Sequence, residues 1–363
     1  MPRTPAIEAR TVWRGLRFRA HLALDAIDEL VFHTRNRTDG LAHEDTTLSV
    51  QMLDRAIALG ARFLKGQQRE NGRLSGFLLQ PGASTTWITA HIAFVLEDIP
   101  QVESLCRRAA GYLAAVGPND GGWGYNRRVA PDCDSTAQAL MVLNRFEVPI
   151  APFLIRFLVE SQETGGGFPT YPPPMPCRPC NGWQVAHPEV SAIVIKALSR
   201  IGGYDSAVQS GLQWVRSTLD DGILPGYWWR GKQYGLWAQA RTGLLSDEAA
   251  DAVGDALSMS NDVPMLPFIL IAAVELNIPW DRLSAAVRKL LVEQKADGSW
   301  DCRPCLRLTS QNCYEAAAEA PGAVFADRRR VFSTAHAVAA LHRIRKQIDF
   351  VANSQTARDT VQC

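Results

Sequence analysis

Two aspartates separated by one residue, Asp132 and Asp134, are the strongest candidates for catalysis by residue type and spacing. Two carboxyl groups that lie close together cannot both ionise cheaply, so one of them can keep its proton near neutral pH. A protonated carboxyl beside an apolar cavity can serve as a general acid. The alternative is that both aspartates cap a helix together with Ser135, because Asp and Ser are favoured at helix starts.

Aromatic residues form the second notable group, since the chain has 10 tryptophans and most stand beside glycines. Aromatic faces attract cations by about 0.5 to 2 kcal/mol each, whereas a ring in a loop can also simply pack over it. Our candidates for a cavity lining that binds substrate are Trp123, Tyr125, His187, Trp228, Trp229, Tyr234, Trp300 and His336. The two histidines could instead orient a protonated carboxyl, or be satisfied core residues.

Basic residues also gather in the glycine-rich connections. The candidates for holding a diphosphate through paired hydrogen bonds are Arg127, Arg128, Arg303 and Arg307. A solvated loop surface explains these arginines equally well. If a diphosphate binds, Mg²⁺ could assist with Glu44 and Asp45; otherwise we expect that no cofactor is required.

Four of the eight cysteines lie in two identical Cys-Arg-Pro-Cys tetrapeptides. A tetrahedral zinc site could form from thiolates at this spacing, namely Cys177, Cys180, Cys302 and Cys305. A redox or disulfide role is a second alternative. We favour unpaired structural cysteines, so zinc is not expected.

The elements that must position these residues are predicted to be helices. Apolar residues recur at i, i+3, i+4 and i+7, and they almost never alternate with period two. The segments come in pairs that repeat at roughly 50 residues, the sign of an array of helical units. Amphipathic first members are expected over 53–68, 102–116, 152–162, 206–219, 247–259 and 281–294. More uniformly apolar second members are expected over 85–96, 135–146, 188–201, 234–245, 267–276 and 333–344.

A helix that is apolar on all sides must be buried on all sides, so the second members should form an inner layer. We therefore predict an all-α chain with a single (α/α)6 barrel of six inner and six outer helices over residues 49–347. Residues 1–48 would form an N-terminal helical extension, and residues 348–363 a C-terminal tail. An open solenoid is the competing arrangement, because it too is built from helix pairs.

The connections within the pairs carry a repeated pattern. Gln294, Gly298 and Trp300 read Gln-x-x-x-Gly-x-Trp, residues 162–168 end in Phe instead, and weaker copies occur in three other repeats. Such a glutamine can bond backbone groups left open at neighbouring helix ends. The pattern resembles the QW motif of the squalene–hopene cyclase and oxidosqualene cyclase family, and more distantly the β subunits of protein prenyltransferases. The resemblance covers about residues 50–345.

The stretch from Pro131 to Ala137 is similar to the Asp-x-Asp-Asp-Thr-Ala motif of class II terpene cyclases, with Ser135 in place of the third acidic residue. The resemblance implies that Asp134 is the general acid that protonates an alkene or epoxide, and that Asp132 is its partner. It also implies an enzyme of the isomerase or lyase class, a protonation-initiated isoprenoid cyclase acting on a linear polyprenyl chain or prenyl diphosphate.

Two alternatives remain open: a non-catalytic barrel that binds an isoprenoid or a peptide, and a zinc-dependent prenyltransferase-like subunit. The related cyclases generally pair two barrels, whereas this chain has length for one. Self-association or a second barrel as partner could therefore complete the site.

Charge and hydropathy exclude other classes. With 38 Lys+Arg against 37 Asp+Glu the net charge is +1, which argues against a protein that grips nucleic acid by charge. No apolar run approaches the roughly 20 residues that span a bilayer, and no signal peptide is evident, so we expect a cytoplasmic protein. The basic segment from Arg3 to Arg19 could contact a membrane, although a helix clamped to the barrel is the favoured interpretation.

Overall fold

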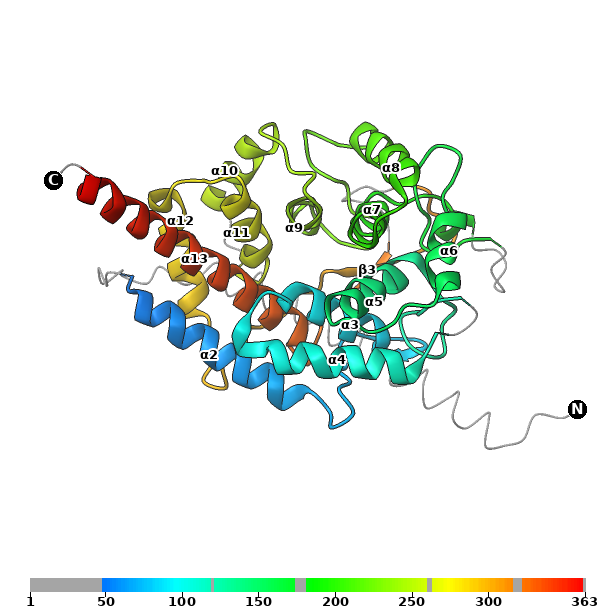
Figure 1. Ribbon diagram of the computed structural model, residues 1–363, viewed down its shortest axis with the longest axis horizontal. Helices are drawn as coiled ribbons and strands as arrows, with labels where there is room; N and C mark the ends of the chain where they lie inside the picture. Colours follow the sequence, from blue (N-terminus) through cyan, green and yellow to red (C-terminus); the bar gives the residue numbers. More distant parts are fainter. Residues whose placement is uncertain (1–47, 119–120, 174–180, 260–262, 316–321, 362–363) are drawn as a thin grey trace, which may run out of the picture.

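The computed structural model describes residues 48–118, 121–173, 181–259, 263–315 and 322–361, and within them the chain is mostly helical (Figure 1). The apolar series of helices consists of α3 (Thr86–Leu96), α5 (Cys133–Arg145), α7 (Pro188–Ile201), α9 (Gln233–Thr242), α11 (Leu266–Glu275) and α13 (Val331–Val361). The amphipathic series consists of α2 (Val50–Gln67), α4 (Glu103–Val116), α6 (Pro152–Glu160), α8 (Asp205–Ser217), α10 (Ala249–Met259) and α12 (Trp280–Val292). Short 3-10 helices span Pro100–Val102, Asn181–Gln184 and Val263–Met265.

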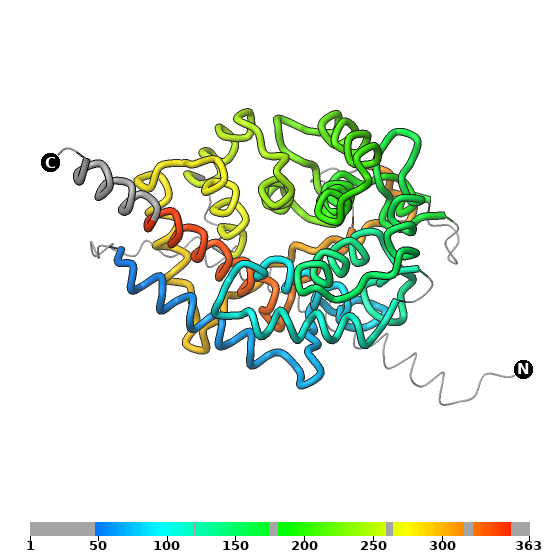
Figure 2. The backbone as a smooth tube through the Cα atoms, in the orientation of Figure 1, coloured from blue at the N-terminus to red at the C-terminus, as the bar shows by residue number. Residues whose placement is uncertain are grey.

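The apolar helices pack in a closed series. Each of α3, α5, α7, α9, α11 and α13 contacts the next, and α13 contacts α3. The amphipathic helices pack on them, with α4 on α3 and α5, α6 on α5, α8 on α7, α10 and α12 on α11, and α2 on α13. Figure 2 traces the chain from α2 round to α13, which lie against each other. The first and last units of an open solenoid do not meet, whereas here α13 contacts both α2 and α3.

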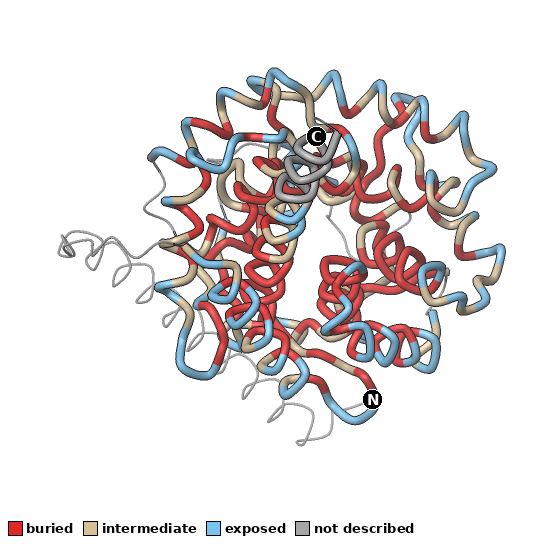
Figure 3. Tube along the Cα trace, turned by 60° about the vertical axis from the view of Figure 1, so that its left-hand side comes forward, coloured by how far each residue is buried: buried red, intermediate tan, exposed pale blue. Residues whose placement is uncertain are grey.

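Burial follows from the two kinds of sequence. Every residue of α3 is buried, as expected for a helix that is apolar all round. In α2 the buried residues recur every three or four positions, from Leu53 to Leu64, so that one face packs inward and the other meets solvent. Figure 3 shows the same distribution, with buried residues concentrated on the inner helices and exposed ones around the rim.

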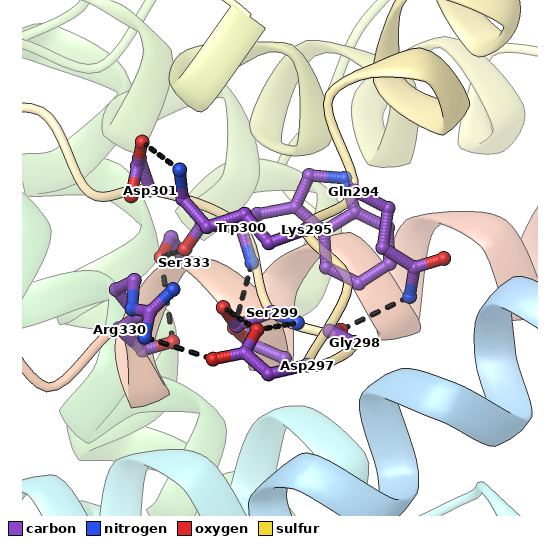
Figure 4. Close-up of polar contacts among 10 residues, drawn as sticks. Gln294, Lys295, Asp297, Gly298, Ser299, Trp300, Asp301, Arg330 and Ser333 are labelled. Carbon is purple, nitrogen blue, oxygen red and sulfur yellow. Dashed lines mark hydrogen bonds and ion pairs between the residues drawn. The ribbon is translucent and has the colours of Figure 1, made fainter.

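Three glutamines tie the outer helices together in the same way. Gln68, Gln162 and Gln294 each donate from Nε2 to the carbonyl oxygen of the glycine four residues later and to a carbonyl of the following outer helix. For Gln294 these acceptors are Gly298, at 3.0 Å (Figure 4), and Ala56, at 2.9 Å. Ala56 belongs to α2, so this bond joins the last outer helix to the first.

Two features differ from the sequence-based expectation. Two short antiparallel hairpins are present, β1 (Leu78–Leu79) with β2 (Gly82–Ala83), and β3 (Leu306–Thr309) with β4 (Gly322–Phe325). Strands of two to four residues are too short to show a period-two pattern. Helix α13 continues to Val361 instead of ending near residue 344, because no glycine or proline stops it there. Residues 1–47 of the expected extension over 1–48 lie outside the described residues.

Candidate active site

The apolar helices begin around a cavity of about 330 Å³, a volume at the lower end of the range for small-molecule sites. Its wall comes from the starts of α3, α5, α7 and α9, from the connection before α9, and from β3. Aromatic side chains supply much of this wall: Trp87, Tyr125, Tyr171, Trp183, Trp228, Trp229 and Tyr234. The carboxyl groups of Asp132, Asp134 and Glu189 also belong to it.

Asp132 and Asp134 play different structural parts at the start of α5. Asp132 is the N-cap: its Oδ1 accepts a hydrogen bond from the backbone N–H of Ser135 at 2.6 Å, and its Oδ2 accepts one from the Ser135 hydroxyl at 2.7 Å. Asp134 lies in the first turn, half-buried beside the cavity. Its Oδ2 accepts from Nε1 of Trp87 at 2.6 Å and its Oδ1 from Nε2 of Gln138 at 2.9 Å. The capping role therefore falls to Asp132 and leaves the carboxyl of Asp134 facing the cavity.

Both carboxyls hold protons more tightly than an exposed aspartate does. Burial raises the pKa of Asp132 to about 8, and repulsion from Asp134 adds to the shift. Burial also raises the pKa of Asp134 to about 6, against the opposing hydrogen bonds from Gln138 and Trp87. Because neighbouring groups titrate as a pair, these values indicate that the two carboxyls together hold about one proton near pH 7.

A line of buried polar side chains leads from Asp134 into the core. Oε1 of Gln138 lies 2.8 Å from Nδ1 of His91, and Nε2 of His91 lies 3.4 Å from Nε2 of His336. Nδ1 of His336 donates to the carbonyl oxygen of Phe332 at 2.8 Å. Burial lowers the pKa of both imidazoles, that of His336 to about 3, so both are neutral at pH 7.

Sequence reasoning missed Trp87, Gln138 and His91 as parts of this site. Gln138 carries a usable signal, because it stands four residues after Asp134 and four residues is one helical turn. Trp87 and His91 lie 47 residues before their partners in the chain, so only the packing of α3 against α5 places them.

The connection before α9 is held rigidly at the cavity. Oε1 of Glu189 accepts from the backbone N–H groups of both Tyr227 and Trp228 at 2.8 Å. Nε1 of Trp228 donates to Oγ1 of Thr170 at 2.7 Å. Burial raises the pKa of Glu189 to about 7, and its Oε2 is buried with no hydrogen-bond partner in the described part of the chain.

Trp229 forms the centre of an aromatic stack in the wall. Its ring centroid lies 4.0 Å from that of Tyr234 with an interplanar angle of 11°, and 5.1 Å from that of Phe332 at 7°. The backbone of Trp229 pairs with Leu306 of β3, which brings this hairpin into the wall. The missed hairpin is thus part of the site.

The structure separates the aromatic candidates into two groups. Tyr125, Trp228, Trp229 and Tyr234 line the cavity, whereas the lining formed by the described residues does not include Trp123 or Trp300. These two rings lie at helix junctions and donate from Nε1 to carbonyls of the preceding outer helix, Trp123 to Leu113 at 3.3 Å and Trp300 to Leu290 at 2.7 Å. Trp123 and Trp300 therefore pack over loops, which was the alternative to lining a cavity.

The two candidate histidines occupy different places. His187 precedes α7, stacks on Tyr227 with centroids 3.7 Å apart, and bonds to Thr170 and to the carbonyl of Gly182. His336 lies in the core and reaches Asp134 through His91 and Gln138. The groups that donate directly to Asp134 are instead Trp87 and Gln138.

The candidate diphosphate arginines do not form one cluster around the cavity. Arg307 lines it, but its buried guanidinium donates to the carbonyl oxygens of Gly226 and Tyr227. Arg127 and Arg128 are exposed and Arg303 is half-buried, and the cavity lining in the described chain includes none of these three. Glu44 and Asp45 lie outside the described residues.

Cys177 and Cys180 also lie outside the described residues. Cys302 and Cys305 have free thiols, and burial raises the pKa of Cys302 well above its ordinary value. Among the side chains that the structure describes, no group of three or more His, Cys, Asp or Glu is placed to hold a metal ion. None of the described helices has both the length and the apolar character needed to cross a bilayer.

No model of a protein family matches the sequence, and no curated protein matches it. Solved structures do match. MstE from Scytonema, described as a type II terpene cyclase, matches with a TM-score of 0.70 at 20% identity, over 82% of this chain and 99% of that one. An MstE variant in complex with geranylgeranyl dihydroxybenzoate, its substrate, matches with a TM-score of 0.68 at 19% identity, over 82% and 98%. A protein from Actinoplanes gives 0.66 at 22% identity, over 80% and 99%.

A possible member of the GH105 family from Salmonella enterica matches less well, with a TM-score of 0.54 at 10% identity, over 86% of this chain and 98% of that one. At such identities a similarity establishes the fold, whereas activity must be argued from the site itself. The chain has a largely helical fold that it shares with a type II terpene cyclase.

Proposed function

We propose that this protein is a class II isoprenoid cyclase, which protonates an alkene of a linear polyprenyl chain, with or without a diphosphate, and closes rings through carbocations. The observation that carries the proposal is the pair of proton-holding carboxyls, Asp132 and Asp134, beside an aromatic-lined cavity. We also propose that the closed series of apolar helices and its outer partners form an (α/α)6 barrel, which places the helix starts at one mouth.

In the proposed first step Asp134 transfers its proton to the terminal alkene. The O–H bond of Asp134 breaks, a C–H bond forms at the less substituted carbon, and positive charge develops on the more substituted one. Protonating an alkene requires an acid that carries its proton when the substrate binds. Burial raises the pKa of Asp134 to about 6 and that of Asp132 to about 8, so the proposal requires the proton that the pair keeps near pH 7 to be on Asp134 when the substrate is bound. Asp132 is the second carboxyl of the pair, and repulsion from Asp134 helps to keep a proton on it.

The cavity wall suits the cation that follows. The faces of Trp229 and Tyr234 can stabilise positive charge without reacting with it, at about 0.5 to 2 kcal/mol for each ring. The hydrogen bonds that Tyr227 and Trp228 donate to Glu189 and Thr170 fix the neighbouring segment, so the rings are preorganised before the substrate arrives. Loss of a proton to a base, or capture of water, would end the reaction.

The length of the chain is compatible with this activity. The match spans 99% of the MstE chain and 82% of this one, so a protein described as a type II terpene cyclase has a similar extent. A second barrel or a second copy is therefore not a precondition of the proposal. Light scattering of the purified protein will show whether it self-associates.

The test is incubation with prenyl diphosphates of increasing length, squalene and geranylgeranyl dihydroxybenzoate, followed by mass spectrometry. We expect one class to be cyclised, and Asp134→Asn to reduce turnover by about a thousandfold or more, within the contribution of a general acid and its electrostatic surroundings. The matched control is Asp205→Asn, an exposed aspartate in the first turn of α8, which should leave turnover unchanged.

Circular dichroism should show the same helix content for both variants. Cyclisation by Asp134→Asn at the wild-type rate would contradict the proposal. Binding of a polyprenyl compound without any product, unaffected by Asp134→Asn, would favour the non-catalytic binding protein instead.

A further inference from the structure

The polar chain from Asp134 into the core ends on a group that can only accept a hydrogen bond. The side chains of Gln138, His91 and His336 are 0% exposed, and the rings of Trp87 and Phe332 stack on His91 at 4.9 and 5.2 Å. Polar groups buried in this way must satisfy one another. The donor and acceptor of each hydrogen bond in this series can therefore be assigned by starting from its last member, the carbonyl oxygen of Phe332.

The carbonyl oxygen of Phe332 accepts from Nδ1–H of His336. A neutral imidazole has one N–H, so Nε2 of His336 is then an acceptor and needs the Nε2–H of His91. Nδ1 of His91 becomes an acceptor in turn and needs an N–H of Gln138. The amide oxygen of Gln138 is left facing Asp134, where it needs an O–H donor, which is a protonated carboxyl.

The opposite direction fails at the two histidines. In the structure Nε2 of Gln138 faces Asp134 and Oε1 faces His91, the arrangement that suits an ionised Asp134. His91 must then donate from Nδ1, so its Nε2 has no hydrogen and faces the equally bare Nε2 of His336 at 3.4 Å. The two ends of an amide have nearly the same shape, so rotation of the Gln138 amide by half a turn converts one arrangement into the other.

We infer that Gln138, His91 and His336 act as positioning residues that favour the protonated form of Asp134, because their hydrogen bonds are all satisfied only when Asp134 donates. The inference deepens the proposed function by saying how the acid keeps its proton. When an alkene occupies the cavity, the O–H turns from Gln138 toward it. After the transfer the amide rotates and donates to the new carboxylate.

The charged and titratable groups around the chain agree with this direction. An extra proton between His91 and His336 would also relieve the conflict, but burial and the positive charge of Arg241 on α9 both disfavour an imidazolium there. Other titratable groups near Asp134 are Asp132 beside α5, Cys133 on α5, Glu189 on α7 and Tyr234 on α9. A negative charge on Asp134 raises the pKa of Asp132, Cys133 and Glu189, so its surroundings hold carboxyls and a thiol that take up protons more readily when Asp134 ionises.

The direct test reads tautomers in the wild-type protein without substrate. Nitrogen NMR of protein labelled in its 7 histidines should assign the proton to Nε2 in His91 and to Nδ1 in His336 at neutral pH. His91→Phe and His336→Phe identify the two signals. Finding His91 protonated at Nδ1 at a pH where Asp134 is protonated would overturn the inference.

The second test measures the proton on Asp134 by infrared spectroscopy, as the carboxylic-acid band that is lost in Asp134→Asn. In His336→Phe the hydrogen-bond acceptor of His91 is lost, so the direction of the bonds through His91 and Gln138 is no longer fixed. In Gln138→Met the hydrogen bond to Asp134 is removed. Each change should lower the pH at which this band disappears by about 1, a tenfold change in proton affinity. His342→Phe, a half-buried histidine further along α13, is the control and should leave the band unchanged.

An unchanged titration in both His336→Phe and Gln138→Met would also overturn the inference. These measurements need no turnover, so they separate the inference from the proposed function. If the tautomers and the titration are as expected but no cyclised product forms, the inference about the hydrogen bonds is supported and the proposed cyclase activity is contradicted.

Discussion

Two buried carboxyl sites lie at opposite ends of the apolar helices, and their partners differ. Where the helices begin, Asp134 accepts hydrogen bonds from the neutral groups of Trp87 and Gln138. Where α3 ends, Glu97 is more deeply buried and receives two bonds from Arg200, at 2.8 and 2.5 Å, and one from Arg241, at 2.9 Å. One site holds its carboxyl among uncharged donors, and the other surrounds it with cations.

The difference separates a carboxyl that can do chemistry from one that holds the fold. Two guanidiniums form ion pairs with the carboxylate of Glu97 and compensate the loss of water around it. Burial lowers the pKa of Arg241 to about 10, which still leaves it charged at pH 7. The aspartates have no such compensation in the hydrogen bonds described above, so their pKa values rise and a transferable proton remains.

The largest effect should come from neutralising Glu97. Glu97→Gln leaves Arg241 buried without its counter-charge, so we expect the free energy of unfolding to fall by about 3 to 5 kcal/mol. Urea unfolding followed by circular dichroism measures this loss. The control is Glu103→Gln, whose exposed ion pair with Arg107 should contribute at most about 1 kcal/mol. Equal stability of the two variants would break the contrast between the sites.

The second prediction concerns pH and sharpens the contrast at the aspartate site. The pKa of Asp132 is about 8 in the folded protein, against about 3.9 in an unfolded chain, so the folded state binds more protons between these values. The stability that this proton contributes is fully present below about pH 4 and is lost as the pH rises through 8. Asp132→Asn keeps the cap and lacks this titration.

Relative to the wild type, Asp132→Asn should therefore gain stability as the pH rises, by up to about 1.4 kcal/mol per pH unit. Urea unfolding from about pH 5 to about pH 8 measures the slope. The exposed Asp205→Asn should show no such slope. A difference between Asp132→Asn and the wild type that stays constant with pH would mean that Asp132 ionises normally.

The helical organisation could be predicted from the sequence because it depends on local patterns of apolar and capping residues. Apart from the end of α13, the helix boundaries lie within three residues of the expected ones. The same patterns placed Asp134 at the start of this helix, since the stretch before Ala137 carries capping residues, although the N-cap is Asp132 and Asp134 lies in the first turn. Helix formation and the position of a helix start depend on residues a few positions away, and a single sequence contains this information.

The partners of the aspartates could not be predicted in this way. Trp87 and His91 each meet α5 across 47 residues, and His336 meets His91 across 245. Those separations are bridged by the packing of helices from different repeats, for which no local signal exists. For the same reason the sequence could not tell Trp300, at a helix junction, from Trp229, in the cavity wall.

The smallest expected effect distinguishes these two tryptophans. Trp300→Phe keeps a ring over the junction but loses the hydrogen bond to Leu290, which should cost about 1 kcal/mol of unfolding free energy and leave turnover unchanged. Trp229→Leu removes an aromatic face from the wall, and a lost cation–π contact of about 1.4 kcal/mol would slow cyclisation by about tenfold. Parallel unfolding and turnover measurements on both variants decide between the roles. If Trp300→Phe slowed turnover as much as Trp229→Leu without any loss of stability, Trp300 would also act on the substrate. It would then belong to the active site and not only to the helix junction.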